Sequence, residues 1–151
     1  MKEVAKFYED FEIGETRTTD SRTITETDIV FHAMHSGDFM PHHMDAEWCK
    51  TQPFKKPIAH GNATFSISVG LTIQGEPLNP HGMSYGYDKI RYPNPVYAGD
   101  TIKVKVTVIS KKDHPKSPSH GLITEEKITT NQRDEVVCIA HHVVYVEKRN
   151  P

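Results

Sequence analysis

The sequence predicts an α+β fold in which an antiparallel sheet of four or five strands wraps around one long, buried helix. Residues 59–73 (AHGNATFSISVGLTI) contain no charged side chain apart from a histidine, which indicates a helix buried on most sides. Residues 102–108 alternate apolar and polar side chains, as a half-buried strand does. Residues 136–146 (VVCIAHHVVYV) are nearly continuously apolar, as in a central strand. A sheet and a helix that both need cover can bury one another by packing.

The length of 151 residues fits one domain over residues 1–151, and 36% hydrophobic residues allow a core. Eighteen Lys+Arg against twenty Asp+Glu give a net charge of −2, without the basic excess expected of a nucleic-acid surface. No apolar run reaches the roughly 18 residues of a transmembrane helix, and the first residues lack a signal peptide's apolar stretch. Cys49 and Cys138 have no metal or redox spacing. We therefore expect a cytoplasmic protein with no membrane or nucleic-acid partner.

The first third of the chain is predicted to hold one strand and two helices. These are an exposed strand over residues 17–24, a helix from Thr25 to about His35, and a short helix from Asp45 through Cys49. The strand segment is polar but rich in threonine. Thr25 and Asp28 have the spacing of a capping box, and the apolar residues that follow recur at i and i+4. Gly37 ends the first helix, and a loop is predicted from there to Met44.

The second half of the chain is predicted to be mostly strand. The predicted strands cover residues 84–92, 102–108, 122–130 and 136–146. The segment 59–73 contains β-branched residues, so a strand is an alternative there, but its length favours a helix. Ala63, Ile67, Gly70 and Leu71 are predicted to form one close-packed stripe on this helix.

The densest group of reactive side chains lies in the predicted loop, over residues 36–45 (SGDFMPHHMD). Asp38 and His43 are five positions apart with Pro41 between them, and the fixed φ of a proline can turn the loop so that both side chains face one point. A carboxylate and an imidazole that converge on a water suit general acid–base catalysis, which typically contributes ~10²–10⁴-fold in rate. The spacing leaves a structural alternative, in which Asp38 caps loop amides and His43 packs locally.

Gly61 is a second candidate, because it falls where the buried helix is predicted to begin. The first amides of a helix are unpaired and carry the positive end of its dipole. Such an amide can stabilise a negative charge on a carbonyl oxygen, and a glycine lets a substrate approach closely. The alternative is that Gly61 only relieves crowding where helix and sheet meet.

Ten histidines raise the alternative of a metal site. The candidate ligands are His42, His43, His60 and Asp45. The helical HxxxH spacing is absent, and two adjacent loop histidines bind one ion only with particular backbone geometry, so no metal is expected. His32 and His35, three positions apart on the first predicted helix, are interpreted as a surface pair.

Several segments together carry a family resemblance. They are Tyr8-x-Asp10-Phe11-x-x-Gly14, Arg22-Thr-Ile-Thr-Glu-x-Asp28-Ile29, Ser36-Gly37-Asp38-Phe39-x-Pro41-x-His43-x-Asp45, Pro57-Ile58-Ala59-His60-Gly61 and Tyr87-Asp88-Lys89-Ile90-Arg91-Tyr92-x-x-Pro95-Val96-x-x-Gly99-Asp100. In this order they resemble the MaoC-like dehydratases, which include the (R)-specific enoyl-CoA hydratases. The match spans about two thirds of the chain, roughly residues 7–108. Each segment alone is common, but the combination is specific.

The resemblance implies a hot-dog fold, with a central helix wrapped by an antiparallel sheet and dimers formed through paired sheets. It also implies reversible addition of water to a trans-2-enoyl-CoA, giving the (R)-3-hydroxyacyl-CoA. The family's catalytic pair falls on Asp38 and His43, and the glycine that binds the thioester oxygen falls on Gly61. No cofactor is implied beyond the coenzyme A of the substrate. We expect a homodimer, and a hexamer built from three dimers stays open.

The chain departs from the family pattern at two positions. At the position of Met40 the family commonly has asparagine. Near the position of Val69 on the central helix, the family often has a serine. Two other functions stay open as alternatives: thioester hydrolysis, which also occurs on this fold, and binding of acyl thioesters without catalysis. The Asp38–His43 pair favours hydration, because a protein that only binds gains little from a buried carboxylate.

Overall fold

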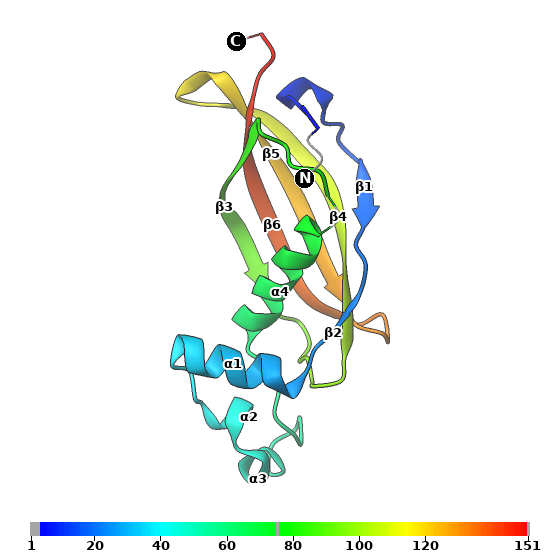
Figure 1. The fold of residues 1–151 in the computed structure, drawn as a ribbon, viewed down its shortest axis with the longest axis vertical. Coiled ribbons are helices and arrows are strands. Elements are labelled where there is room, and N and C mark those ends of the chain that lie inside the picture. The colour runs from blue at the N-terminus through cyan, green and yellow to red at the C-terminus, as the bar shows by residue number, and fades with distance from the viewer. Residues whose placement is uncertain (1–3, 75, 151) are drawn as a thin grey trace.

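The computed structural model describes residues 4–74 and 76–150, so both ends of the predicted domain, residues 1–3 and 151, lie outside the described residues. The elements in chain order are η1 (Tyr8–Asp10), β1 (Thr16–Thr18), β2 (Arg22–Thr23), α1 (Glu26–Ser36), α2 (Pro41–Met44), α3 (Ala46–Cys49), α4 (Gly61–Ile73), β3 (Gly82–Arg91), β4 (Thr101–His114), β5 (Ser117–Thr130) and β6 (Val136–Glu147). The predicted α+β architecture is confirmed: an antiparallel sheet curls around the central helix α4 (Figure 1).

The strand order of the sheet is β1-β4-β5-β6-β3, and β2 also pairs with β4. Every one of these pairings is antiparallel. The helix α4 lies on the concave face, while α1, α2 and α3 gather beyond its N-terminal end (Figure 1). The opposite end of the sheet extends past the C-terminal end of α4, since β4 and β5 are longer than the helix. The N-terminal end of α4 is therefore the place where loops from the first third of the chain meet the sheet.

The side of α4 that packs on the sheet is built from small side chains. The buried residues of the helix are Ala63, Thr64, Ser68, Leu71 and Thr72, and Ile67 packs half-buried against the core. The predicted stripe is therefore confirmed at Ala63 and Leu71 and in part at Ile67. The hydroxyl groups bond to the helix's own backbone: Thr64 donates to the His60 carbonyl at 3.3 Å and Ser68 to the Thr64 carbonyl at 2.7 Å. These buried hydroxyls are thereby satisfied, and the helix can lie close to an apolar sheet.

Several predicted elements hold, and two are wrong. The capping box is confirmed, since the Thr25 hydroxyl accepts from the Asp28 amide and the Asp28 carboxylate accepts from the Thr25 amide. The single strand predicted over residues 17–24 is wrong: β1 and β2 are separate, and Thr19 between them exchanges hydrogen bonds with Val104. The loop predicted up to Met44 is wrong in part, because α2 forms there as one helical turn that starts at Pro41.

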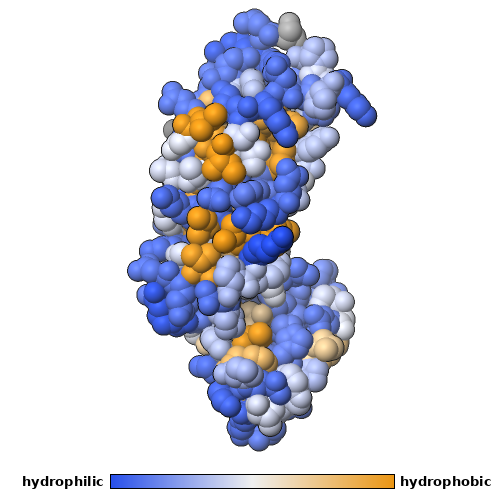
Figure 2. Space-filling view, turned by 180° about the vertical axis from the view of Figure 1, so that it is seen from behind, coloured by the Kyte–Doolittle hydropathy of each residue, from blue (hydrophilic) through white to orange (hydrophobic). Residues whose placement is uncertain are grey.

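The strands of the second half are confirmed, but the predicted spans 102–108 and 122–130 are too short. The hairpin of β4 and β5 continues to His114 and Ser117 through polar sequence. Away from the core the two strands no longer alternate apolar and polar residues, and they continue through backbone hydrogen bonds to one another. Seen from behind, the sheet's outer face shows apolar side chains in separate patches among polar ones (Figure 2). Within the described ranges, no helix has the length and apolar character needed to cross a membrane.

Candidate active site

Asp38 is held in place by the end of α1. Gly37 takes the left-handed conformation, with φ of 78°, and its amide donates to the Ala33 carbonyl. This turn directs the chain toward α2. One carboxylate oxygen of Asp38, Oδ1, then accepts from the Met40 amide at 3.3 Å. The other oxygen, Oδ2, faces His43.

His43 is fixed in one tautomer. Its Nδ1 lies 2.7 Å from the Ile58 carbonyl oxygen, and since a carbonyl only accepts, Nδ1 carries the hydrogen. In the neutral ring Nε2 then bears a lone pair. This atom lies 3.9 Å from Oδ2 of Asp38, too far for a direct hydrogen bond. The two atoms are both acceptors, so a molecule that carries two O–H donors, such as water, suits the space between them.

The two side chains sit in different environments. Only 6% of the His43 side chain is exposed, against 45% for Asp38, so the expectation of a buried carboxylate is wrong. Burial lowers the pKa of His43 most strongly, and the neighbouring His60 and His42 lower it further. The Ile58 carbonyl and the Asp38 carboxylate act in the opposite direction, but the pKa stays below its usual value. At neutral pH, His43 is therefore a neutral acceptor beside a solvated carboxylate.

His60 touches both members of this pair. It is the N-cap of α4, and its Nε2 lies 2.9 Å from the Asp38 carbonyl oxygen. Its ring stacks on that of His43, with centroids 3.6 Å apart and an angle of 24° between the planes. His32 also packs against His60, at 4.6 Å between centroids, so the predicted surface pair of His32 and His35 is wrong for His32.

Of the four candidate metal ligands, His43 and His60 come together with Asp38, and one atom from each of the three lies within 4.8 Å of the others. Their ring geometry does not suit a metal ion. A metal must lie in the plane of each imidazole at about 2.0–2.1 Å from its nitrogen, and two stacked rings share no such point. Asp45 caps α3 instead, accepting from the Trp48 amide at 2.8 Å. The geometry therefore suits proton chemistry better than metal binding.

Gly61 and His43 line the same cavity, which has a volume of about 400 Å³. Gly61 is the first residue of α4, and its amide has no acceptor within the helix. A Cβ at this position would lie 2.6 Å from the ring of Tyr92. The absence of a side chain therefore lets the aromatic ring pack directly on the start of the helix. The structure thus brings the three predicted site residues, Asp38, His43 and Gly61, to the N-terminal end of α4.

Two neighbours of the site were missed in the sequence. Tyr92 follows β3 and reaches Gly61, and its hydroxyl donates to the Asn62 side chain at 3.0 Å. His60 was considered only as a metal ligand, although it contacts both Asp38 and His43. A glycine at a helix start indicates that something approaches closely there, but no spacing in the sequence identifies an aromatic ring thirty-one positions later as that neighbour.

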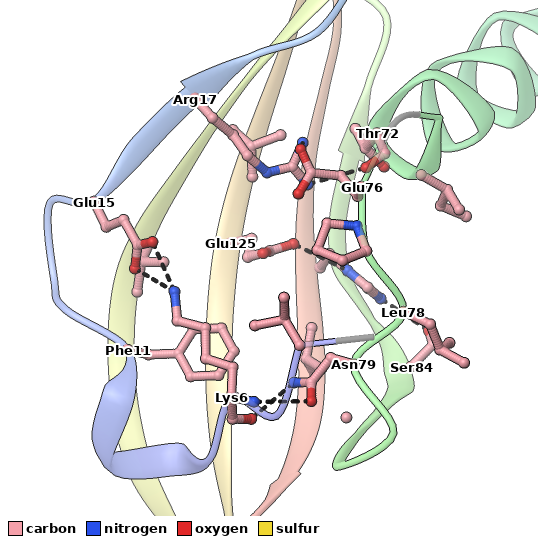
Figure 3. Close-up of a pocket in the computed structure, with 18 of the residues that line it drawn as sticks. Lys6, Phe11, Glu15, Arg17, Thr72, Glu76, Leu78, Asn79, Ser84 and Glu125 are labelled. Atoms are coloured by element: carbon pink, nitrogen blue, oxygen red, sulfur yellow. Dashed lines mark hydrogen bonds and ion pairs between the residues drawn. The ribbon is translucent and has the colours of Figure 1, made fainter. Parts of the chain in front are cut away.

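A second cavity, of about 680 Å³, lies beyond the C-terminal end of α4 (Figure 3). It forms because α4, with 13 residues, is about 20 Å long, whereas β5, with 14 residues, is about 46 Å long. Its walls are largely apolar, but two ion pairs also line it. Arg17 lies 3.4 Å from Glu76, and Lys6 lies 2.7 Å from Glu15. These cations are therefore already matched by carboxylates.

Glu125 points into this second cavity from the sheet (Figure 3). It contacts His142 at 3.4 Å and the buried Lys127 at 3.6 Å. Burial raises the pKa of Glu125, but the hydrogen bond from His142 and the charge of Lys127 outweigh this effect, so that its pKa lies below the usual value. Burial lowers the pKa of Lys127, and Glu125 opposes the shift. The pair stabilises two charges that neither could hold alone at this depth.

Comparison with known proteins points to one family. A family model described as "MaoC like domain" matches residues 10–131. Protein MaoC of Klebsiella aerogenes is 35% identical over 102 residues, which cover 68% of this chain but only 30% of that protein. The (R)-specific enoyl-CoA hydratase of Rhodospirillum rubrum is 30% identical over 129 residues, which cover 84% of this chain and 78% of that enzyme.

Solved structures agree with the fold. The X-ray structure of a monoamine oxidase regulatory protein from Archaeoglobus has a TM-score of 0.89 and 33% identity, and the match covers 95% of both chains. A Mycobacterium tuberculosis protein described as having a double hotdog fold has a TM-score of 0.77 over 97% of this chain and 45% of that one, at 16% identity. The predicted hot-dog fold is therefore confirmed.

The Glu125–Lys127 pair leads to a prediction about stability. Glu125→Gln leaves Lys127 buried without its counter-charge, so we expect the free energy of unfolding to fall by about 2–4 kcal/mol. Glu126→Gln is the matched control, since Glu126 pairs with His141 and its side chain is 31% exposed. We expect it to cost less than about 1 kcal/mol. Urea unfolding measures both, and equal losses would contradict the assigned role of the pair.

Proposed function

Because the chain belongs to the MaoC-like domain family, we propose that it reversibly hydrates a trans-2-enoyl-CoA to the (R)-3-hydroxyacyl-CoA. The observation that carries this proposal is the pair of acceptors, Oδ2 of Asp38 and Nε2 of His43, 3.9 Å apart beside the start of α4. The name of the Rhodospirillum rubrum relative, (R)-specific enoyl-CoA hydratase, supports the substrate class.

In the proposed reaction, a water donates one hydrogen to Asp38 and the other to His43. Its oxygen lone pairs then face the substrate. Asp38 takes a proton as the oxygen attacks the β carbon of the enoyl group. Asp38 suits this role because Oδ2 of its carboxylate faces His43 and its side chain is 45% exposed. His43 suits its role because its tautomer leaves Nε2 as an acceptor.

The Gly61 amide is proposed to bind the thioester oxygen. As water adds to the β carbon, negative charge moves to this oxygen and an enolate-like state forms. A helix N-terminus stabilises such a charge. The proton taken by the Asp38–His43 pair is then delivered to the α carbon on the same face, giving syn addition. Water is the only co-reactant that this step requires, so we propose no metal, and no cofactor beyond the coenzyme A of the substrate.

We also propose that the chain forms a homodimer through β3. This strand lies at the edge of the sheet and has only β6 as a neighbour among the described strands. Its side chains Met83 and Tyr85 are 70% and 60% exposed. A ten-residue edge strand with exposed apolar side chains is a template for pairing with another strand. If β3 pairs with β3 of a second copy, the free backbone groups of both edge strands form hydrogen bonds and the dimer has two-fold symmetry. Assembly of three such dimers into a hexamer stays open.

The catalytic pair is tested with crotonyl-CoA, by following loss of the enoyl-thioester absorbance. We expect Asp38→Asn and His43→Gln each to lower kcat/KM at least ~10²-fold, because each removes one acceptor for the water. His35→Gln, on the exposed end of α1, is the control and should keep full activity. A wild type that is inactive on crotonyl-, longer and branched enoyl-CoAs would overturn the proposal. Release of free thiol instead would identify a thioesterase.

The role of Gly61 is tested by comparing two glycines of α4. In Gly61→Ala the new Cβ meets the Tyr92 ring, so we expect the helix start to shift and kcat/KM to fall at least ~10-fold. Gly70→Ala is the matched control, since a Cβ there has no heavy atom within 4 Å. It should leave activity unchanged and stabilise the helix by roughly 0.5–1 kcal/mol. Equal activity of the two variants would argue against the oxyanion role.

The dimer is tested by light scattering after size exclusion at micromolar concentration. We expect at least twice the chain mass of 17.1 kDa. Met83→Lys with Tyr85→Lys places charges on the edge and should shift the protein toward monomer while its circular dichroism stays native. A wild type that elutes as a monomer at every concentration, or charged variants that assemble as the wild type does, would contradict pairing through β3.

A further inference from the structure

Four histidine rings form a continuous row of contacts through the proposed site, which we call the stack. The His43 and His60 planes lie at 24° to one another, while the His42–His43 and His32–His60 planes are tilted by 55° and 51°. The ring of His42 lies 3.9 Å from that of His43, His43 lies 3.6 Å from His60, and His60 lies 4.6 Å from His32, measured between centroids. The rings come from α1, from α2 and from the residue that caps α4. The proposed hydration uses only His43, so the other rings need a separate explanation.

The ionisable groups that act on His43 come from three segments. The loop after α1 contributes Asp38, α2 contributes His42 and the residue that caps α4 contributes His60, whereas His32 of α1 is a neighbour of His60 and His35. From α3, the Cys49 thiol points to the His42 carbonyl at 3.7 Å. The Tyr92 phenol borders the same cavity as His43. Asp38 is the carboxylate that acts on both His32 and His43, and a proton on one ring repels a proton on the next.

His60 has a further feature that sets it apart. Its Nδ1 is buried and has no hydrogen-bond partner in the described structure. Its Nε2 donates to the Asp38 carbonyl, so the neutral ring has its hydrogen on Nε2. His60 therefore holds the backbone of Asp38 through Nε2 while its ring lies against that of His43.

We propose that His60 positions the Asp38–His43 pair, and that the adjacent ring of His42 keeps His43 in its neutral, water-accepting form into weakly acidic pH. This inference rests on the proposed hydration for its effect on rate. The arrangement itself is independent of that reaction. Burial and the neighbouring His60 and His42 lower the pKa of His43, which is the direction that the proposal requires.

The electrostatic part is tested by replacing the neighbouring ring of His42 with a ring that does not titrate. In His42→Phe an aromatic ring beside His43 stays and one protonatable group is lost. We expect the pKa of His43, followed by NMR of labelled imidazoles, to rise by about 0.5–1 unit. The acid limb of kcat/KM should move to higher pH by the same amount. His120→Phe is the control, because His120 stacks on Tyr145 away from the site.

The positioning part is tested with two variants of one residue. His60→Gln keeps an N–H donor near the place of Nε2, whereas His60→Ala removes the donor and the ring. We expect the alanine variant to lower kcat at least ~10-fold with little change in KM, and glutamine to restore most of this loss. Equal loss in both variants would overturn the positioning role. Urea unfolding of both variants identifies any loss that comes from misfolding.

These measurements separate the two proposals. If the wild type hydrates no enoyl-CoA but the pKa of His43 still rises when His42 is replaced, the proposed function fails and the effect of His42 on His43 stands. If hydration is found but neither the pKa of His43 nor the acid limb moves, the effect of His42 is wrong and hydration by Asp38 and His43 stands.

Discussion

The packing of α4 on the sheet is the constraint on which the rest of the structure depends. This helix has no charged residue, and its buried hydroxyls bond to carbonyls of its own backbone. It can therefore lie against the apolar face formed by residues such as Val104 and Val137 without leaving polar groups unsatisfied. A helix fixed in this way fixes its own N-terminus. That end carries His60 and Gly61, so the depth of one packed helix sets the position of the proposed oxyanion site.

The first third of the chain is then tied to this fixed end by backbone groups. The Ile58 carbonyl orients His43, while the Ile58 amide donates to the His42 carbonyl at 3.0 Å. Ile58 also forms a bridge to Tyr97, and the Ala59 amide donates to the Val96 carbonyl at 2.7 Å. The short segment before α4 thus connects α2 to the loop that follows β3. Because backbone groups make these bonds, the orientation of His43 depends on the path of the chain more than on neighbouring side chains.

The sequence predicted what periodicity and local motifs encode. The absence of charge identified α4, the alternation over residues 102–108 identified part of β4, and the capping box placed the start of α1. It did not predict α2, because one helical turn is too short to show a period. It predicted Asp38 and His43 as a pair, but not the stack of four imidazoles. Rings from α1, α2 and the cap of α4 meet only through tertiary packing, which leaves no spacing to detect.

The departure at Met40 can be judged from the bonds that hold the loop. Asp38 is positioned by the Met40 amide, its own amide donates to the Ser36 hydroxyl at 3.2 Å, and its carbonyl accepts from His60. None of these bonds uses the side chain at position 40, which points outward and is 55% exposed. The side chain at position 40 therefore takes no part in orienting Asp38 in this chain. Methionine instead places an exposed apolar side chain on the surface close to the proposed catalytic pair.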